Sequence, residues 1–421
     1  MSPRRPAVAF VMITLLIDVI GIGLIVPVLP LLVGEFTSGR DTQAYWYGAV
    51  AVIYGATQFL CAPLLGALSD RFGRRPLLLL GIAGLGATFL LTAVARSLWL
   101  IVAARVLGGG LSANFAVAQA YVADVTPPEQ RTQSLGKLGA MFGIGFVLGP
   151  VLGGVLGDVD LRLPLYGAAG LCALNWLYGL LVLPESLPAS QRRPLSLARV
   201  NPLVSLAGVS RLHGVGALVA AFAFTVLPQW MLQTTWVLYT NFRFGWGPRE
   251  SGLSLFVVGL VAMIVQGVLL GPLIRALSER RLILAAMLSA AFAYAGYGLS
   301  THGWMLFVII ACNFLAFSSV VTIQGIVSKA AGPEEQGRVM GTLSSLQSLT
   351  AVIAPILGTA VLGQVTFLPP SDWRVGAPFF LCSSVQALAF VIAWRHFAAQ
   401  NAAPAGSPLP LGRGAGGEGP T

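Results

Sequence analysis

The chain has 421 residues, of which 56% are hydrophobic and only 10% are charged, and its formal net charge is +10. Its mean hydropathy is +0.82. Soluble domains carry about 25% charged residues, and water cannot solvate this much apolar surface, so the composition excludes a soluble globular protein and indicates a chain folded in lipid.

Twelve apolar segments, each long enough to cross a bilayer as a helix, follow one another along the chain. The first contains Asp18 and two prolines and is too long for a cleaved signal peptide. The sequence therefore predicts an all-α integral membrane protein with twelve transmembrane helices. The segments lie near residues 7–33, 44–68, 76–95, 98–121, 134–157, 164–183, 213–240, 251–274, 282–300, 303–328, 337–363 and 375–396.

The basic residues give the expected orientation. With a cytoplasmic N-terminus, eighteen of the 25 lysine and arginine residues fall on the cytoplasmic side, as the positive-inside rule requires. We expect both termini in the cytoplasm and a multi-pass protein of the plasma (inner) membrane. The positive charge thus reflects topology and gives no reason to expect a nucleic-acid partner.

Two stretches repeat along the chain and divide it into halves. Pro63–Arg71 aligns without gaps with Pro272–Arg280, 209 positions later, and Gly136, Pro150 and Gly153 match Gly341, Pro355 and Gly358, 205 positions later. Both copies run in the same direction, as in a parallel repeat about the membrane normal. We expect an N-terminal six-helix half at 1–184, a cytoplasmic linker at 185–211, a C-terminal six-helix half at 212–398 and a disordered tail at 399–421.

A charged turn separates the second and third segments. The prediction is a conformational latch that ion pairs hold together, and the other reading is a set of ordinary topogenic charges at the interface. The residues concerned are Gly66, Asp70, Arg71, Gly73, Arg74 and Arg75 in the turn, Asp124 at the end of the fourth segment, and Glu279 and Arg280 in the second copy.

Small residues at spacings of four mark the fifth segment. Such spacing forms a groove that a second helix can approach closely, and a proline permits a kink. The residues are Gly145, Gly149, Pro150, Gly153 and Gly154. We predict an antiporter helix motif here, and the alternative is a generic packing face.

Two charged residues lie deep within spans. Asp18 in the first span costs about 2.5–3.5 kcal/mol on insertion scales unless it faces a cavity or a partner. Arg105 is the one cation well inside a predicted span, and its natural partners are Asp18 or Gln58. We expect both to serve proton coupling; a purely structural acid and a structural or snorkelling arginine are the alternatives.

Uncharged polar and aromatic residues interrupt the spans of both halves. Polar groups in lipid need partners, so we expect them to face a central substrate cavity, although each alone also fits interhelical hydrogen bonding. They are Tyr54, Gln58, Asn114, Gln119, Gln233, Trp236, Gln266, Asn313 and Gln324.

These motifs resemble those of a known family. The stretch GALSDRFGRRP is similar to the loop between helices 2 and 3 of the major facilitator superfamily, whose acids and arginines are thought to stabilise the outward-open state. The pattern around Gly145–Gly154 resembles the helix-5 signature of the superfamily's antiporters, and Arg105 resembles the helix-4 arginine of proton-coupled members. Over residues 8–397 the chain looks like the tetracycline/proton antiporters, within the twelve-helix drug/proton branch.

The chain also departs from that group. Thr88 and Ala290 stand where those antiporters commonly carry membrane acids, Ala262 stands where they carry a histidine, and the eighth span contains no histidine. Asp18 is then the one acid clearly inside a predicted span.

The sequence predicts a secondary transporter that exports a lipophilic small molecule, tetracycline-like or another drug, in exchange for protons, and so confers antibiotic resistance. The alternatives are a proton-linked importer of a metabolite or sugar, a channel, and a non-transporting sensor or scaffold. The chain has no phosphate-loop, metalloprotease or serine-hydrolase motif, so we expect no enzyme activity, no cofactor and no metal. We expect a monomer whose partners are lipid, protons and a small-molecule substrate.

Overall fold

The computed structural model describes residues 5–112, 114–192, 194, 216–330 and 336–402. Within these ranges the chain is helical and contains no β-strand. Long apolar runs leave every backbone polar group to be satisfied inside its own segment, which a helix achieves. The all-α membrane fold class is therefore confirmed.

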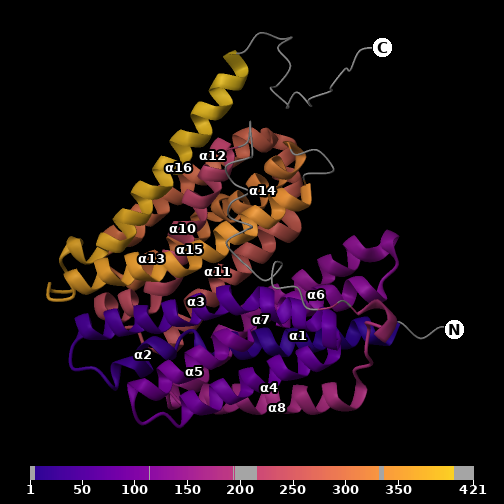
Figure 1. Cartoon of the computed structure of the whole chain (residues 1–421). Helices are drawn as coiled ribbons and strands as arrows, with labels where there is room; N and C mark the ends of the chain where they lie inside the picture. The colour runs from indigo at the N-terminus through magenta and orange to yellow at the C-terminus, as the bar shows by residue number, and fades with distance from the viewer. Residues whose placement is uncertain (1–4, 113, 193, 195–215, 331–335, 403–421) are drawn as a thin grey trace, which may run out of the picture.

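The part of the first half that the structure describes forms eight helices, coloured indigo to magenta in Figure 1. They are α1 (Arg5–Ile25), α2 (Leu29–Gly34), α3 (Arg40–Phe72), α4 (Arg74–Ala93), α5 (Leu98–Leu111), α6 (Asn114–Val125), α7 (Pro128–Val159) and α8 (Leu163–Val182). A short 3-10 turn, η1 (Ala189–Gln191), follows them.

The described residues of the second half form seven α-helices and three shorter helical turns. The helices are α10 (Gly216–Phe244), α11 (Pro248–Ile264), α12 (Leu270–Leu299), α13 (Gly303–Cys312), α14 (Ser319–Ala330), α15 (Gln336–Val365) and α16 (Ala377–Ala402). The turns are the π-helical η4 (Val265–Leu269) and the 3-10 segments η5 (Phe314–Ser318) and η6 (Trp373–Gly376).

The number of spans differs from the prediction. Among the described residues ten helices are long and apolar enough to cross a membrane, or eleven if the pair α13 and Phe314–Lys329, bent by 54°, counts as one span. The difference lies in Pro248–Leu299, which counts as one segment of 52 residues although its backbone breaks at Ser278, and which takes in the predicted spans 251–274 and 282–300. At 1.5 Å per residue these 52 residues rise about 78 Å, about two and a half times the thickness of a bilayer core, which is enough for two spans. The count of twelve stays a prediction, and so does the placement of the termini.

The two halves touch at one end and separate at the other. α3 contacts α15, and α7 contacts α11, along the seam between the lower and upper parts of Figure 1. A Cβ atom added at Gly363 of α15 would lie 2.7 Å from the Tyr45 ring of α3, whereas one added at Gly66 of α3 or Gly341 of α15 would meet no described atom within 4 Å. We name the first end, near Tyr45, the closed end and the second the open end.

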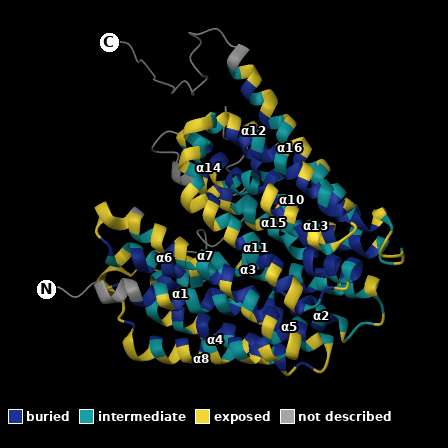
Figure 2. Cartoon of the chain, turned by 180° about the vertical axis from the view of Figure 1, so that it is seen from behind, coloured by how far each residue is buried: buried dark blue, intermediate teal, exposed yellow. Residues whose placement is uncertain are grey.

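Large apolar side chains on the outside suit a lipid solvent. Each half buries its own core, shown dark blue in Figure 2, while outer helix faces remain exposed. Leu181 on α8 is 75% exposed and Phe292 on α12 is 70% exposed. Such exposure would be unfavourable in water and is the normal condition of a lipid-facing helix.

The predicted domain boundaries are only partly covered. Most of the predicted linker, 193 and 195–211, lies outside the described residues, and the described part begins at Glu185, which packs against the first half. α16 continues to Ala402, past the predicted boundary at 398. The rest of the predicted tail, 403–421, lies outside the described residues.

Candidate functional site

Asp18 lies at the junction of three helices of the first half. It is 2% exposed. Its Oδ2 accepts a hydrogen bond of 2.6 Å from Asn114 Nδ2 on α6, and its Oδ1 accepts one of 3.1 Å from Asn175 Nδ2 on α8. Asn175 also donates to the Thr14 carbonyl at 3.1 Å. The sequence-based list omitted Asn175, although a single amide in an otherwise apolar span was a visible signal.

Arg105 does not pair with Asp18 or with Gln58 as expected. Its Nη2 donates to Thr92 Oγ1 at 3.3 Å, and its guanidinium lies over the Tyr54 ring at 5.8 Å from the centroid. Its Nε is buried without a hydrogen-bond partner among the described residues.

A break between α5 and α6 gathers several predicted polar residues. Ser112, directly after α5, has a hydroxyl that contacts the Tyr54 hydroxyl at 3.0 Å and accepts a hydrogen bond from Gln58 Nε2 at 3.1 Å. Both partners lie on α3, so the broken span is held against α3 by side chains. The cluster is built as interhelical hydrogen bonding, and its members are half-buried.

The remaining predicted cavity residues fall into different surroundings. Trp236 is 3% exposed, donates from Nε1 to Ser254 Oγ at 2.9 Å and packs edge-on against Tyr297, so it belongs to the core of the second half and not to a cavity. Asn313 is buried and accepts from the Ser289 hydroxyl at 2.8 Å. The other four lie at exposed or half-buried positions: Gln119 on α6, Gln233 on α10, Gln266 in η4 and Gln324 on α14.

The glycines of α7 face two different helices. Gly145, Gly149 and Gly153 lie against α1, where a Cβ added at Gly149 would come 2.6 Å from Gly23 Cα. Gly154 lies against α11 of the other half, where its Cβ would come 2.7 Å from the Pro248 carbonyl oxygen. The α7 motif therefore joins the Asp18 helix on one side to the second half on the other, at the closed end.

The charged turn between α3 and α4 forms an ion-pair cluster centred on Arg74. Its Nη1 lies 2.6 Å from Asp70 Oδ1 and 2.6 Å from Ser69 Oγ, and its Nε lies 3.1 Å from Asp124 Oδ2 at the end of α6. The Arg74 side chain is 11% exposed, and that of Asp70 is 42% exposed. Three of the predicted latch residues are thus brought together, and Gly66 lies one turn before them on α3.

Sequence reasoning missed Glu185, which follows α8 in the chain and accepts hydrogen bonds from the same turn. Its Oε1 accepts from the Arg74 backbone N–H at 2.8 Å and its Oε2 from that of Arg75 at 3.3 Å. A carboxylate at these orphan N–H groups stabilises the start of α4. Gly73 has φ of 109°, and a side chain there would collide with Glu185.

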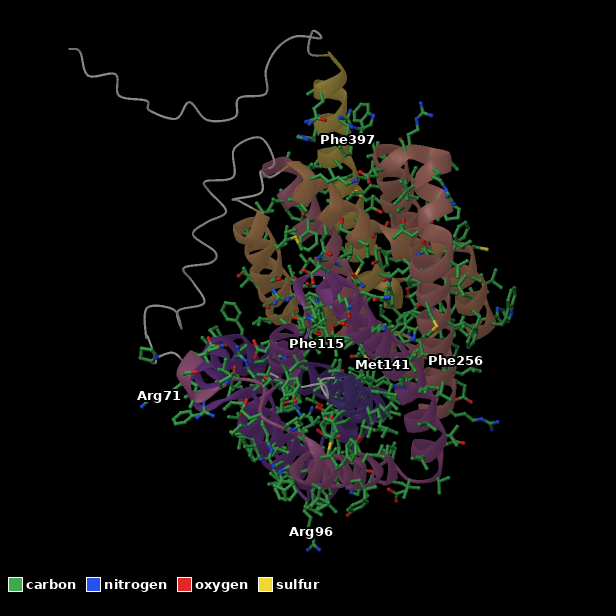
Figure 3. The ribbon with its side chains drawn as sticks, turned by 90° about the vertical axis from the view of Figure 1, so that its right-hand side faces the viewer. Arg71, Arg96, Phe115, Met141, Phe256 and Phe397 are labelled. Atoms are coloured by element: carbon green, nitrogen blue, oxygen red, sulfur yellow. The ribbon has the colours of Figure 1, made fainter. Side chains whose placement is uncertain are left out.

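The other two arginines of the turn point elsewhere. Arg75 donates from Nη2 to the Leu180 carbonyl at 2.7 Å. Arg71 lies over the Phe72 ring, 5.2 Å from its centroid, at the periphery of the molecule (Figure 3). A cavity of about 520 Å³ opens beside the cluster and is lined by Asp70, Arg74, Asp124, Leu187 and Gln191.

The second copy of the turn breaks at Ser278, the one non-glycine residue with positive φ among those described (φ 64°, ψ 156°). Gly73 has similar angles (109°, 161°) and lies 205 positions earlier. The structural repeat therefore has the 205-residue spacing of the α7 and α15 motifs. The 209-residue alignment of the two phrases is four residues out of register with the backbone.

At this spacing the two halves carry the same ion pair with opposite charges. Arg74 corresponds to Glu279 and Asp124 corresponds to Lys329. Glu279 Oε1 does pair with Lys329 Nζ, which is the charge-reversed equivalent of Arg74 with Asp124. Arg280, the other predicted latch residue of the second copy, has its guanidinium over the Phe397 ring. Lys329 was visible only once the register was known.

Comparison with known proteins is consistent with this architecture. The sequence profile of the Major Facilitator Superfamily matches residues 11–355. The class C tetracycline resistance protein of Escherichia coli is 36% identical over 369 residues, covering 87% of this chain and 93% of that protein. Multidrug resistance protein 2 of Bacillus subtilis is 26% identical over 396 residues, covering 90% and 92%.

A solved structure shares the arrangement over its whole length. The crystal structure of the human organic anion transporter MFSD10 superposes with a TM-score of 0.65 at 26% identity, covering 93% of this chain and 100% of that one. The family profile covers most of the chain, and the class C relative exceeds 30% identity over nearly all of it. The chain therefore belongs to the Major Facilitator Superfamily of membrane transporters.

Proposed function

We propose that the protein is a proton-coupled exporter of lipophilic drugs in the plasma membrane, and that Asp18 is the group that carries the proton. This proposal rests on the surroundings of Asp18. Its carboxyl is buried, and its hydrogen-bond partners among the described residues are two neutral amides. Buried ionised groups are unfavourable unless an opposite charge pairs with them. A carboxyl without a cation partner is neutralised by taking up a proton.

Protonation changes how α1 is held. The hydrogen bonds from Asn114 and Asn175 to an ionised carboxylate are charge-assisted, and they weaken when the carboxyl becomes neutral. Asn114 is the first residue of α6, directly after the break in that span, and Asp124, near the other end of α6, belongs to the ion-pair cluster. A proton at Asp18 would therefore loosen the connection between α1 and the helix that leads to the cluster at the open end.

Alternation between two states follows from the closed and open ends. A ligand shifts such an equilibrium only through different affinities for the two states. In the state described, the halves meet at the closed end through α7 and α11, and the cluster of Arg74 stands at the open end. We propose that the reverse state brings the open ends together and that Asp18 exchanges its proton between the two sides. The relatives named tetracycline resistance proteins support drug export as the direction.

The test is transport in inside-out membrane vesicles that contain the full chain. An imposed proton gradient, acidic inside the vesicle, should drive accumulation of a drug such as tetracycline or an ethidium dye, and Asp18→Asn should abolish the gradient-driven part while leaving protein levels unchanged. Asp41→Asn, at the exposed start of α3, is the matched control and should transport normally. Gradient-driven loss of drug from the vesicles would indicate import, and normal exchange by Asp18→Asn would remove Asp18 from the mechanism.

A further inference from the structure

Three phenylalanines form a continuous row between α6 and α7, which we name the aromatic shelf (Phe115, Phe142 and Phe146). Phe115 and Phe142 meet edge to face with ring centroids 5.4 Å apart, and Phe142 and Phe146 stack with centroids 6.3 Å apart. Phe115 is 39% exposed and Phe142 is 41% exposed. The rings pack on one another and still present open surface.

The position of the other faces of α7 shows where this surface points. With 100° per residue, Gly145, Gly149 and Gly153 form the side toward α1, and Pro150 and Gly154 form the side toward α11. The exposed, lipid-suited side is opposite to both and carries Leu148, Leu152, Val155 and Val159.

On the same wheel Phe142 falls on the α1 side of α7 and Phe146 falls between the α1 side and the α11 side, and neither falls on the lipid-suited side. Since α1 belongs to the first half and α11 to the second, this sector faces the space between the halves and not lipid. Phe115 is seen between the two halves in Figure 3. The aromatic shelf is therefore an interior surface of the open end.

The α6 part of the shelf follows the same logic. Phe115 and Gln119 lie one turn apart on one face, and both are exposed. The adjoining face of α6 packs into the core of the first half through Val117, Ala118, Tyr121 and Val122. A predicted cavity residue, Gln119, thus lies beside the rings on the open face.

In its deprotonated form Asp18 places a negative charge near the shelf, and no described cation forms an ion pair with it. Asn114, which donates to Asp18, is the neighbour of Phe115 in the chain. Within the described residues Arg105 bonds to Thr92 and does not neutralise Asp18. Asp18 is 2% exposed, so a bound molecule would experience its field across the low-dielectric wall without touching it. Aromatic faces add an attraction for cations.

We propose that the aromatic shelf binds planar, multi-ring aromatic cations and is the part of the transport site that selects them. This proposal names the substrate class of the proposed exporter. It rests on the proposed export function only for the direction of transport. Two centroid separations of 5.4 and 6.3 Å give a row longer than one ring, so fused rings can contact Phe115 and Phe142 together. A single-ring cation contacts one of them. A polycyclic anion meets the same rings and the opposing field of Asp18.

The test measures equilibrium binding to the purified full-length protein in lipid nanodiscs, with ethidium as the fused-ring probe and phenyltrimethylammonium as the single-ring probe. Ethidium should bind more tightly than phenyltrimethylammonium. Phe115→Ala and Phe142→Ala should each weaken ethidium binding by about three- to tenfold, since one stacked aromatic contact is lost. Phe115→Tyr and Phe142→Tyr keep the ring and should restore most of the affinity. Phe292→Ala, on the exposed face of α12, is the control and should bind as the wild type does.

Each result bears on a separate claim. Unchanged ethidium affinity in both alanine variants, or no ethidium binding by the wild type, overturns the shelf. A loss that the tyrosine variants do not recover assigns the effect to misfolding and also overturns it. If the binding pattern holds while vesicles show no gradient-driven transport, the shelf stands and the export function fails.

Discussion

The contact between Gly154 on α7 and α11 gives a direct handle on the conformational equilibrium. A Cβ added at Gly154 would lie 2.7 Å from the Pro248 carbonyl oxygen and 3.1 Å from Gly252 Cα, both in the other half. Ordinary contacts of a Cβ begin near 3.4 Å, so Gly154→Ala requires the halves to separate there by about 0.7 Å. Overpacking of this kind costs about 1–3 kcal/mol. The described state should lose population by a factor of about 5–150 relative to the reverse state.

Two other glycines of the same helix are matched controls. At Gly143 an added Cβ meets no described atom within 4 Å, so Gly143→Ala should gain about 0.5–1 kcal/mol of helix stability and leave the equilibrium alone. At Gly153 the added Cβ collides with the Leu24 carbonyl inside the first half. Gly153→Ala should therefore lower thermal stability without favouring either state.

The assay is the distance between spin labels at the closed end, placed by Asp41→Cys and Ser371→Cys after the four native cysteines are replaced. Both positions are exposed and belong to different halves. Gly154→Ala should move the distribution toward longer distances, and drug transport should slow because the return to the described state becomes less favourable. A distribution identical to that of the Gly143→Ala protein would refute the assignment of this seam as the point of contact that opens.

Three further variants test the turns at the open end. Lys329→Glu places a negative charge beside Glu279 and should slow transport by up to about fivefold, as expected for a partly exposed pair. Adding Glu279→Lys should recover the transport rate. A double variant that is no faster than the single variant would contradict the pairing. Ser278→Gly removes the backbone strain at φ 64° and should raise the unfolding free energy by about 1 kcal/mol, whereas a melting temperature below that of Ser278→Ala would show that no strain is stored there. Glu185→Ala should lower stability by about 1 kcal/mol through loss of the cap on α4, which a thermal melt in detergent would detect or refute.

The membrane fold could be predicted from the sequence because each pattern that indicates it reflects a physical constraint on a single segment. Long apolar runs impose helices in lipid, an acid at Asp18 must be sheltered, and glycines at spacings of four permit close helix contact. The pairing of Arg74 with Asp70 was predictable because the two lie one turn apart.

The features that could not be predicted depend on the register between the two halves and on the direction in which a side chain points. The phrase repeated at 209 residues is similar in letters, but the backbone break at Ser278 sets the register at 205, and the partner Lys329 follows from the break. Lipid, protein core and cavity wall all accept aromatic residues, so a pattern of apolar positions does not say which of the three a ring faces. Trp236 lies in the core and Phe115 on an open face for reasons that no single helix reveals.

The glycine seam at the closed end also bears on leakage of protons. Where α7 meets α1 and α11, backbone approaches backbone at Gly149, Gly23, Gly154 and Gly252, and no long side chain has to adopt one rotamer for the seam to close. Closing it therefore costs little side-chain entropy, and surfaces this close leave no room for the chain of water molecules that would conduct a proton past Asp18. A larger residue in this seam would act as a wedge, and the expected phenotype is a protein that dissipates the proton gradient without moving its cargo.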